Sequence, residues 1–316
     1  IGKATEGLVA MFLQFIHGSK FLELEGYDKF DICASLQKAT EIEIELMVKN
    51  YGKGYDNICF VGGVALNSSC LGKLAMKMPE KSFYVPPVPY DSGLALGVAQ
   101  LRHHMVEGNS RIKWEPHFSP YLGEKYEVPQ DILDLGKPAT MLDVVNHLKE
   151  DNIVSVYQGR SESGRRALGN RSILASPFNA SMKDKINEKV KHRQSFRPFA
   201  PSVLREDVTK YFERDIDSPY MSFCIPFNDY GKKHCPAVVH VDGTGRLQTV
   251  EKALNPQFHR LLSIWKEVTG HSVLLNTSFN NREPIVETPQ DALNCFRGTE
   301  IDYLYFADHG VLISRE

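Results

Sequence analysis

The segment at residues 159–172 combines positive charge with backbone freedom, since it holds four arginines and three glycines in the run GRSESGRRALGNRS. Glycine lets backbone N–H groups approach an anion closely, and the planar guanidinium of arginine matches two phosphate oxygens at once. Arg166 and Arg171 are therefore candidate phosphate contacts. By itself, an arginine-rich loop is more often a solvated segment held by ion pairs, and that alternative stays open.

A second basic segment contains Lys191 and Arg197. Pro198 and Pro201 stiffen the backbone beside Arg197, which lowers the entropy cost of holding one arginine in place. Preorganised charge of this kind suits a phosphate site. The plainer alternative is a basic helix face that runs into a proline-rich turn.

Two more segments add polar groups. Arg246 follows the turn DGTG at residues 242–245, whose N–H groups can form an anion-binding nest; a hairpin turn in which Arg246 pairs with Asp242 is equally compatible. Asn276, Ser278 and Asn280 follow the apolar pair at residues 274–275, where small amide and hydroxyl groups can bind phosphate or ribose. These residue types also favour helix caps and turns.

The elements that must position these groups follow an α/β pattern. In the first unit we expect helices over residues 5–16 and 31–51, with Asp31 as the cap of the second, and short strands over 58–61 and 82–85. Gly62 and Gly63 form a strand-to-helix turn, and further helices begin near Asn67 and after residues 91–93. A helix over 141–149 and a strand over 153–157 open a second unit of alternating strands and helices.

Length and composition bound the class of protein. The 316 residues favour two domains, and 37 Lys and Arg against 39 Asp and Glu give a net charge of −2, which disfavours passive nucleic-acid binding. No apolar run approaches the length of a membrane span, and the six cysteines are typical of reduced thiols in a cytoplasmic protein. Proline-punctuated residues 107–140 predict a linker between units 1–106 and 141–316.

Taken together, these segments resemble the O-carbamoyltransferases of the NodU/CmcH type. The family patterns are matched by GRxExGxRALGNRSIL at residues 159–174, FRPFAPSV at 196–203, HVDGTxRLQTV at 240–250, LLNTSFN at 274–280 and EPIVxTPxDA at 283–292. In the first unit, GGVALN at 62–67 and DSGLALG at 91–97 look like the corresponding family turns. Such long, ordered matches are highly specific.

The resemblance implies the second half of an actin/sugar-kinase-like ATPase domain followed by a YrdC-like domain. It implies that the YrdC-like part makes carbamoyl adenylate from carbamoyl phosphate and ATP, and that the carbamoyl group then passes to a hydroxyl of a small-molecule acceptor. Carried onto matching positions, Lys191, Arg197 and Arg246 are the catalytic cations that hold carbamoyl phosphate, with Asn276 and Ser278 beside them.

The same resemblance assigns the remaining site residues and the cofactors. The implied ATP contacts are Arg166, Arg171, Asn280, Gly62, Gly63 and Asn67. ATP is expected with Mg²⁺, and Asp91 matches a carboxylate ligand of iron or a similar divalent metal; on its residues alone, Asp91 would be a helix N-cap. The glycines alone would predict only a tight turn.

The chain departs from the family in two ways. The family's metal-binding histidines lie in an upstream half, and no HxxxH occurs here, so we expect that half on a second chain, cleaved away or left out. Arg165 stands where the family often has proline, which adds charge and removes a rigid φ angle. A non-catalytic nucleotide-binding module and an RNA-modification-related YrdC-like protein are the alternative functions.

Overall fold

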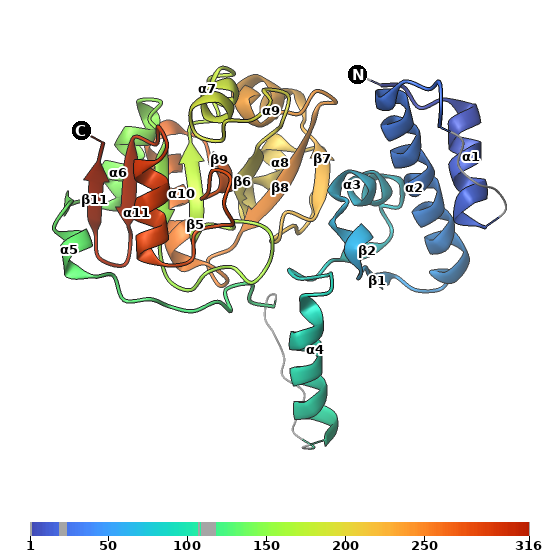
Figure 1. Ribbon diagram of the computed structural model, residues 1–316, viewed down its shortest axis with the longest axis horizontal. Helices are drawn as coiled ribbons and strands as arrows, with labels where there is room; N and C mark the ends of the chain where they lie inside the picture. Colours follow the sequence, from blue (N-terminus) through green and yellow to red (C-terminus); the bar gives the residue numbers. More distant parts are fainter. Residues whose placement is uncertain (1, 19–23, 107, 109–117, 316) are drawn as a thin grey trace.

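The computed structural model describes residues 2–18, 24–106, 108 and 118–315. Its first part consists of four helices and a two-stranded parallel sheet; the first three helices and the small sheet lie together at one end of the molecule, whereas the fourth helix projects away from it (Figure 1). The elements are α1 (Glu6–Ile16), α2 (Lys29–Tyr51), β1 (Asn57–Cys59), a 3-10 turn (Gly63–Leu66), α3 (Ser68–Lys77), β2 (Ser82–Tyr84) and α4 (Gly93–Leu101), which a π-helical turn (Arg102–Val106) extends.

A nine-stranded mixed sheet forms the second part, in the order β3-β11-β10-β4-β5-β9-β6-β8-β7. Its strands are β3 (Lys137–Pro138), β4 (Val154–Tyr157), β5 (Arg171–Ala175), β6 (Ala200–Leu204), β7 (Phe223–Pro226), β8 (Thr244–Val250), β9 (Val273–Ser278), β10 (Tyr303–Phe306) and β11 (Val311–Ser314). Its helices are α5 (Gln130–Leu133), α6 (Met141–Lys149), α7 (Met182–Lys189), α8 (Val208–Tyr211), α9 (Asp229–His234), α10 (Pro256–Thr269) and α11 (Pro289–Arg297). The α/β class expected from the sequence is confirmed.

Side chains alternate between the two faces of this sheet, as a strand requires. Val154 and Val156 of β4 pack with α6 and α10 in one buried cluster, whereas Ile153 and Tyr157 belong to the cluster on the opposite face. That opposite cluster continues into the first part through residues of α3 such as Leu71. The two parts therefore share one hydrophobic core.

Local signals explain where most helices begin. Thr140 and Asp143 form a capping box at the start of α6, and Thr288 and Asp291 form another at α11. The predicted cap of α2 was wrong: Asp28 accepts the N–H groups of Phe30 and Asp31, so the helix begins two residues earlier. An aspartate three residues upstream has the same capping chemistry, and the sequence alone does not separate the two.

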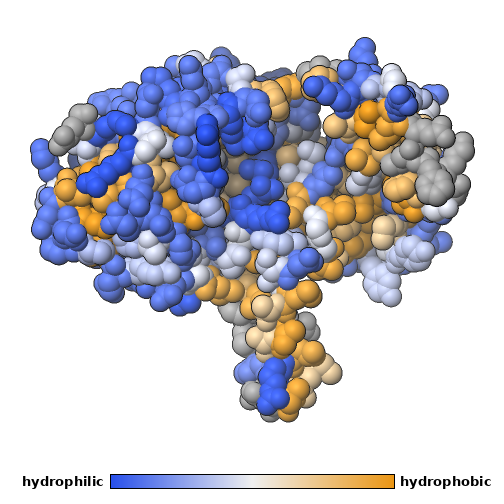
Figure 2. All heavy atoms as spheres, viewed as in Figure 1, coloured by the Kyte–Doolittle hydropathy of each residue, from blue (hydrophilic) through white to orange (hydrophobic). Residues whose placement is uncertain are grey.

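Two regions differ from the sequence-based outline. Part of the expected linker joins the second sheet, because β3 pairs with β11 and α5 lies beside α11. Residues 107 and 109–117 of that linker lie outside the described residues. The helix α4 projects from the body, and Figure 2 shows hydrophobic atoms along it, where Leu94 and Val98 are 68% and 65% exposed.

The contact between the two parts depends on one glycine. α3 lies against β7, the edge strand of the large sheet, and an ideal Cβ on Gly72 would be 1.9 Å from the carbonyl oxygen of Cys224. Only a residue without a side chain permits this approach. Ser68 Oγ accepts from Cys224 Sγ at 3.3 Å in the same contact.

Candidate functional site

Five arginine side chains surround one pocket of about 250 Å³. We call it the arginine pocket, and its lining residues are Arg165, Arg166, Ala167, Arg193, Arg197, Pro198, Met221, Arg246, Asn276, Thr277 and Ser278. None of these residues is acidic. The four sequence segments singled out for their cations and hydroxyl groups thus meet in one place.

Neighbouring strands bring these segments together. Asn276 and Ser278 lie at the end of β9, which pairs with β5 on one side and β6 on the other. Arg246 lies on β8, the next strand after β6. Arg165 and Arg166 come from the loop between β4 and β5, and Arg193 and Arg197 from the loop between α7 and β6. The pocket is therefore built at adjacent strand ends of one sheet.

Within the part of the chain that the structure describes, no carboxylate neutralises the five guanidinium groups. Among the described residues, none of them forms an ion pair with Asp or Glu, and Arg246 Nε is buried without a hydrogen-bond partner. Arg193 is held in place, since its Nε donates to Asn187 Oδ1 at 2.7 Å and its guanidinium lies 4.9 Å from the centre of the Phe199 ring. The pocket is a preformed concentration of positive charge.

The pKa values of these arginines reflect burial and mutual repulsion. Burial, together with the charges of Arg166 and Arg193, lowers the pKa of Arg246 to about 10. Burial also lowers the pKa of Arg166, with a further contribution from Arg165, and that of Arg193, with a contribution from Arg197. Like charges held together without counterions are stabilised by an anionic ligand.

The turn before β8 is not paired with Arg246. Asp242 instead accepts the N–H and the hydroxyl of Thr244, at 3.1 and 2.7 Å. This internal hydrogen bonding closes the turn and leaves Arg246 to line the pocket.

Three of the site residues predicted in the second unit lie outside the pocket lining, and each makes contacts within the protein. Lys191 is 4% exposed, and its ammonium donates to Ser278 O at 2.6 Å, Asn280 O at 2.7 Å and Asn280 Oδ1 at 2.8 Å. An ammonium has three protons, so these oxygens satisfy all of them. Burial, with a contribution from Arg193, lowers the pKa of Lys191 to about 7.

The side chains of Asn280 and Arg171 also form hydrogen bonds within the protein. The Asn280 amide accepts from Lys191 and donates to Glu283 O at 2.7 Å. Arg171 is fully buried, donates to Gln158 O at 2.7 Å and Asn170 O at 3.0 Å, and lies 3.6 Å from the centre of the Tyr157 ring. These residues support the loops around the pocket.

The predicted residues of the first part form a separate group. Gly62 has a φ of +95°, a left-handed conformation that favours glycine, and its N–H donates to Pro89 O at 2.6 Å. This bond joins the two first-part motifs at the ends of β1 and β2. Gly63 begins the 3-10 turn, and Asn67 caps α3 by accepting the N–H of Cys70 at 3.1 Å.

Asp91 is exposed on the same turn. It does not cap α4, whose N-cap position is Ser92. The described residues contain no group of three or more His, Cys, Asp or Glu side chains that could hold a metal ion. The described residues do not by themselves complete the divalent-metal site, whose histidines were expected in an upstream half, so Asp91 as a metal ligand stays a prediction and no chemical step is derived through it.

Arg165 and Arg193 are pocket residues that sequence reasoning did not assign. Arg165 lies inside a matched motif and Arg193 just before one, but the direction in which each side chain points depends on the conformation of its loop. His192, for example, has a φ of +44°, which turns the chain just before Arg193. Nothing in the amino-acid pattern specifies that turn.

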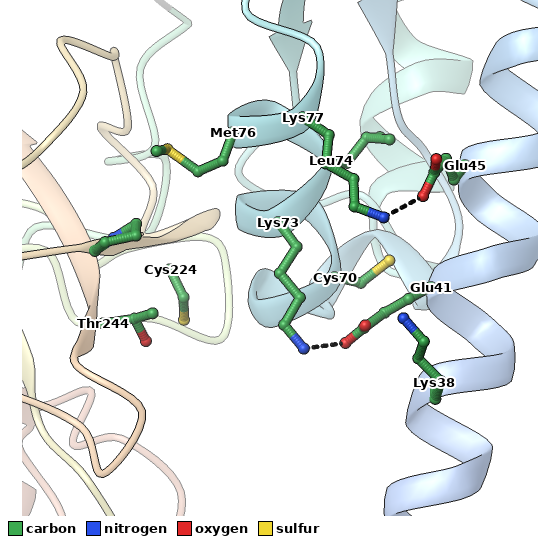
Figure 3. A pocket seen from close by; sticks show the side chains of 11 residues that line it. Lys38, Glu41, Glu45, Cys70, Lys73, Leu74, Met76, Lys77, Cys224 and Thr244 are labelled. Carbon is green, nitrogen blue, oxygen red and sulfur yellow. Dashed lines mark hydrogen bonds and ion pairs between the residues drawn. The ribbon is translucent and has the colours of Figure 1, made fainter. Parts of the chain in front are cut away.

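A second pocket, of about 380 Å³, lies between the two parts of the molecule (Figure 3). We call it the inter-unit pocket, and its lining residues are Lys38, Glu41, Glu45, Cys70, Lys73, Leu74, Met76, Lys77, Cys224, Pro226 and Thr244. Its charges are paired, since Lys73 contacts Glu41 at 2.7 Å and Lys77 contacts Glu45 at 2.5 Å.

No helix among the described residues is long and apolar enough to cross a membrane.

Comparison with known proteins gives the family. The model of the carbamoyltransferase C-terminus matches residues 145–313, and that of the carbamoyltransferase N-terminus matches residues 6–100. An uncharacterized protein of Synechocystis, sll1178, is 38% identical over 314 residues, which cover 87% of this chain and 51% of that protein. The nodulation protein NolNO of Sinorhizobium fredii is 38% identical over 87% of this chain and 42% of its own length.

A relative with a stated activity is similar as well. The 3'-hydroxymethylcephem-O-carbamoyltransferase of Amycolatopsis lactamdurans is 36% identical over 234 residues, which cover 73% of this chain and 44% of that enzyme. The chain spans about half the length of the curated relatives it matches. Both family models and the relatives agree with the resemblance inferred from the motifs, and the chain belongs to the carbamoyltransferase family.

Proposed function

We propose that this chain is the part of an ATP-dependent O-carbamoyltransferase that forms carbamoyl adenylate in the arginine pocket. In this proposal, residues 1–106 are the second half of an actin/sugar-kinase-like domain and residues 141–316 are a YrdC-like domain. The observation that carries the proposal is the meeting of five unpaired guanidinium groups with the amide and hydroxyl groups of Asn276 and Ser278.

The reaction needs such a pocket because its reactants repel each other. Carbamoyl phosphate first loses phosphate to water and gives carbamate. A carbamate oxygen then attacks the α-phosphorus of ATP, the bond from that phosphorus to the β-phosphate oxygen breaks, and pyrophosphate leaves. Two unit charges at 4 Å repel by about 4 kcal/mol at an effective dielectric constant of 20. Converging guanidinium groups offset this repulsion and stabilise the charge on the leaving pyrophosphate.

The residues divide into two roles in this proposal. Arg166, Arg197 and Arg246 contact the anions, with Asn276 and Ser278 beside them. Lys191 supports the pocket without lining it, because its ammonium donates to the carbonyl of Ser278, a lining residue, and to that of Asn280 just after it. In the transfer step an acceptor hydroxyl attacks the carbamoyl carbon and gives its proton to water, while the bond from that carbon to the AMP phosphate oxygen breaks and AMP leaves.

The test is pyrophosphate release from carbamoyl phosphate and ATP by the whole chain. We expect release that depends on both substrates and falls steeply in the Arg246→Met variant. Arg160→Gln is the control, since Arg160 belongs to the arginine-rich segment at residues 159–172, is exposed and does not line the pocket. Absence of release from folded protein, with ATP bound but not consumed, would instead identify a non-catalytic nucleotide-binding module.

An RNA-related function is the remaining alternative, and the net charge of −2 weighs against it. RNA binding through this pocket would weaken steeply as the salt concentration rises, because each phosphate contact releases counterions. A titration of RNA affinity against salt distinguishes this alternative from adenylate formation.

A further inference from the structure

The side chain of Arg165 touches both parts of the molecule. It lines the arginine pocket, and its guanidinium carbon also lies 4.5 Å from the centre of the Tyr90 ring. The preceding residue, Gly164, lies so close to Pro87 that an ideal Cβ would be 2.5 Å from the Pro87 carbonyl oxygen. The loop that carries Arg165 therefore rests on the turn after β2.

A guanidinium can serve both neighbours at once. Its flat face stacks on an aromatic ring, while its N–H groups point outward in the plane and remain available to an anion. Arg165 thus adds one positive charge to the pocket and one contact with the first part of the molecule.

Tyr90 connects this contact to the first-part motifs. It directly precedes Asp91, and the neighbouring Pro89 carbonyl accepts the N–H of Gly62 at 2.6 Å. Restraining the Tyr90 ring therefore restrains the turn that holds both motifs. A ligand that restrains Arg165 in the pocket would therefore also restrain the turn at residues 87–93, through the contact of Arg165 with the Tyr90 ring.

The amount of charge indicates the ligand class. The five guanidinium groups have no carboxylate among the lining residues. A single phosphate group brings about two negative charges at most, which leaves most of this charge uncompensated. A polyphosphate, such as the tail of a nucleoside triphosphate or its pyrophosphate product, compensates more of it.

We propose that Arg165 is an additional polyphosphate contact of the arginine pocket, and that through Tyr90 it couples occupancy of this pocket to the turn at residues 87–93. This inference rests on the proposed function, since it requires the arginine pocket to bind anions. It goes further by naming the residue that favours polyphosphate over phosphate and the segment that responds to binding.

The first experiment measures the affinity of the whole chain for inorganic pyrophosphate and inorganic phosphate by calorimetry. We expect Arg165→Gln to weaken pyrophosphate binding about tenfold or more, the loss typical of one charge-assisted hydrogen bond, and phosphate binding much less. Arg160→Gln, the same change at an exposed residue outside the pocket, should bind both anions as the parent does.

The second experiment measures amide hydrogen exchange at residues 87–93. Pyrophosphate should slow exchange there in the parent and leave it unchanged in Arg165→Gln and in Tyr90→Leu, which removes the ring without altering the charge of the pocket. Protection that persists in Tyr90→Leu would overturn the coupling.

Arg246→Met separates the two proposals. If Arg246→Met loses pyrophosphate binding and Arg165→Gln keeps it, the proposed function stands and the role of Arg165 is wrong. If both variants bind pyrophosphate as tightly as the parent, the arginine pocket is not the anion site and both proposals fail.

Discussion

The arginine pocket and the inter-unit pocket differ in how their charges are balanced. The inter-unit pocket is the larger, but its Lys73 and Lys77 are paired with Glu41 and Glu45, and hydrogen bonds from Lys49 and Lys77 lower the pKa of Glu45 to about 2. The smaller arginine pocket has five cations and no acidic lining residue. Paired charges stabilise the contact between two elements, whereas uncompensated charges of one sign favour the binding of an oppositely charged ligand.

The largest effect is expected from Gly72→Ala, which tests the contact between α3 and β7 beside the inter-unit pocket. The new methyl group would overlap the Cys224 carbonyl, which lies 1.9 Å from its ideal position, so α3 must move away from β7. We expect the free energy of unfolding to fall by about 3 kcal/mol, as for severe overpacking. Urea denaturation measures this loss.

Gly97→Ala is the matched control, because Gly97 is also helical and has no atom within 4 Å of its ideal Cβ. Alanine should leave the stability unchanged or raise it by up to about 1 kcal/mol through helix propensity. Equal stability of the two variants would contradict the close contact between α3 and β7.

Arg246→Met tests the arginine pocket. The loss of one charged contact to the transition state should slow pyrophosphate release about 100-fold, which corresponds to about 2.7 kcal/mol. The ligand-free protein should be at least as stable as the parent, because the substitution removes a buried charge that Arg166 and Arg193 repel.

Stopped assays of pyrophosphate and thermal unfolding with and without ATP measure these two effects. The variant should also lose the rise in melting temperature that ATP causes in the parent. A variant that is less stable without ligand and still active would show that Arg246 has a structural role.

Lys191→Met tests the buried lysine next to the arginine pocket through the pH dependence of the free energy of unfolding. Between pH 7 and about 10, the folded chain has released the Lys191 proton, whereas the unfolded chain still binds it. The free energy of unfolding should therefore rise with pH in this window, by up to about 1.4 kcal/mol per pH unit from this group, and the variant should lack that rise.

The measurement is urea denaturation at several pH values, compared between parent and variant. Lys189→Met is the control, since Lys189 is exposed and pairs only with Glu300 among the described residues. Parallel pH profiles for the parent and Lys191→Met would show that Lys191 keeps an ordinary pKa.

The smallest change in stability is expected from breaking the ion pair between Lys73 and Glu41 in the inter-unit pocket. A double-mutant cycle with Lys73→Met and Glu41→Gln should give a coupling of about 0.5 kcal/mol, because the Lys73 side chain is half exposed and water screens the pair. Neither change should alter pyrophosphate affinity. A large loss of affinity in either variant would mean that the inter-unit pocket takes part in anion binding.

Regular elements could be predicted well because their signals are local. The helix over 141–149 has a capping box at Thr140 and an apolar face, and its observed bounds are Met141–Lys149. The short strand predicted over 153–157 is observed over Val154–Tyr157. The order of the nine strands was not predicted, since β5, β9, β6 and β8 are brought together by pairing between distant segments.

The site could be predicted as a set of segments but not as a set of contacts. Arg246, Arg197 and Ser278 were identified from motifs, and they line one pocket. Lys191 was expected to touch the ligand, yet its three protons are directed to Ser278 and Asn280. Residue type shows that a cation is present, and only the fold shows whether its protons are free for a ligand.

The way α3 covers β7 also bears on the exposure of this edge of the large sheet. An edge strand that exposes its N–H and C=O groups can recruit a strand from another molecule and begin a chain of intermolecular pairing. At Cys224, the backbone of Gly72 occupies the space that such a strand would need. One residue without a side chain thus lets α3 cover this edge strand, and we expect its replacement to lower the solubility of the protein.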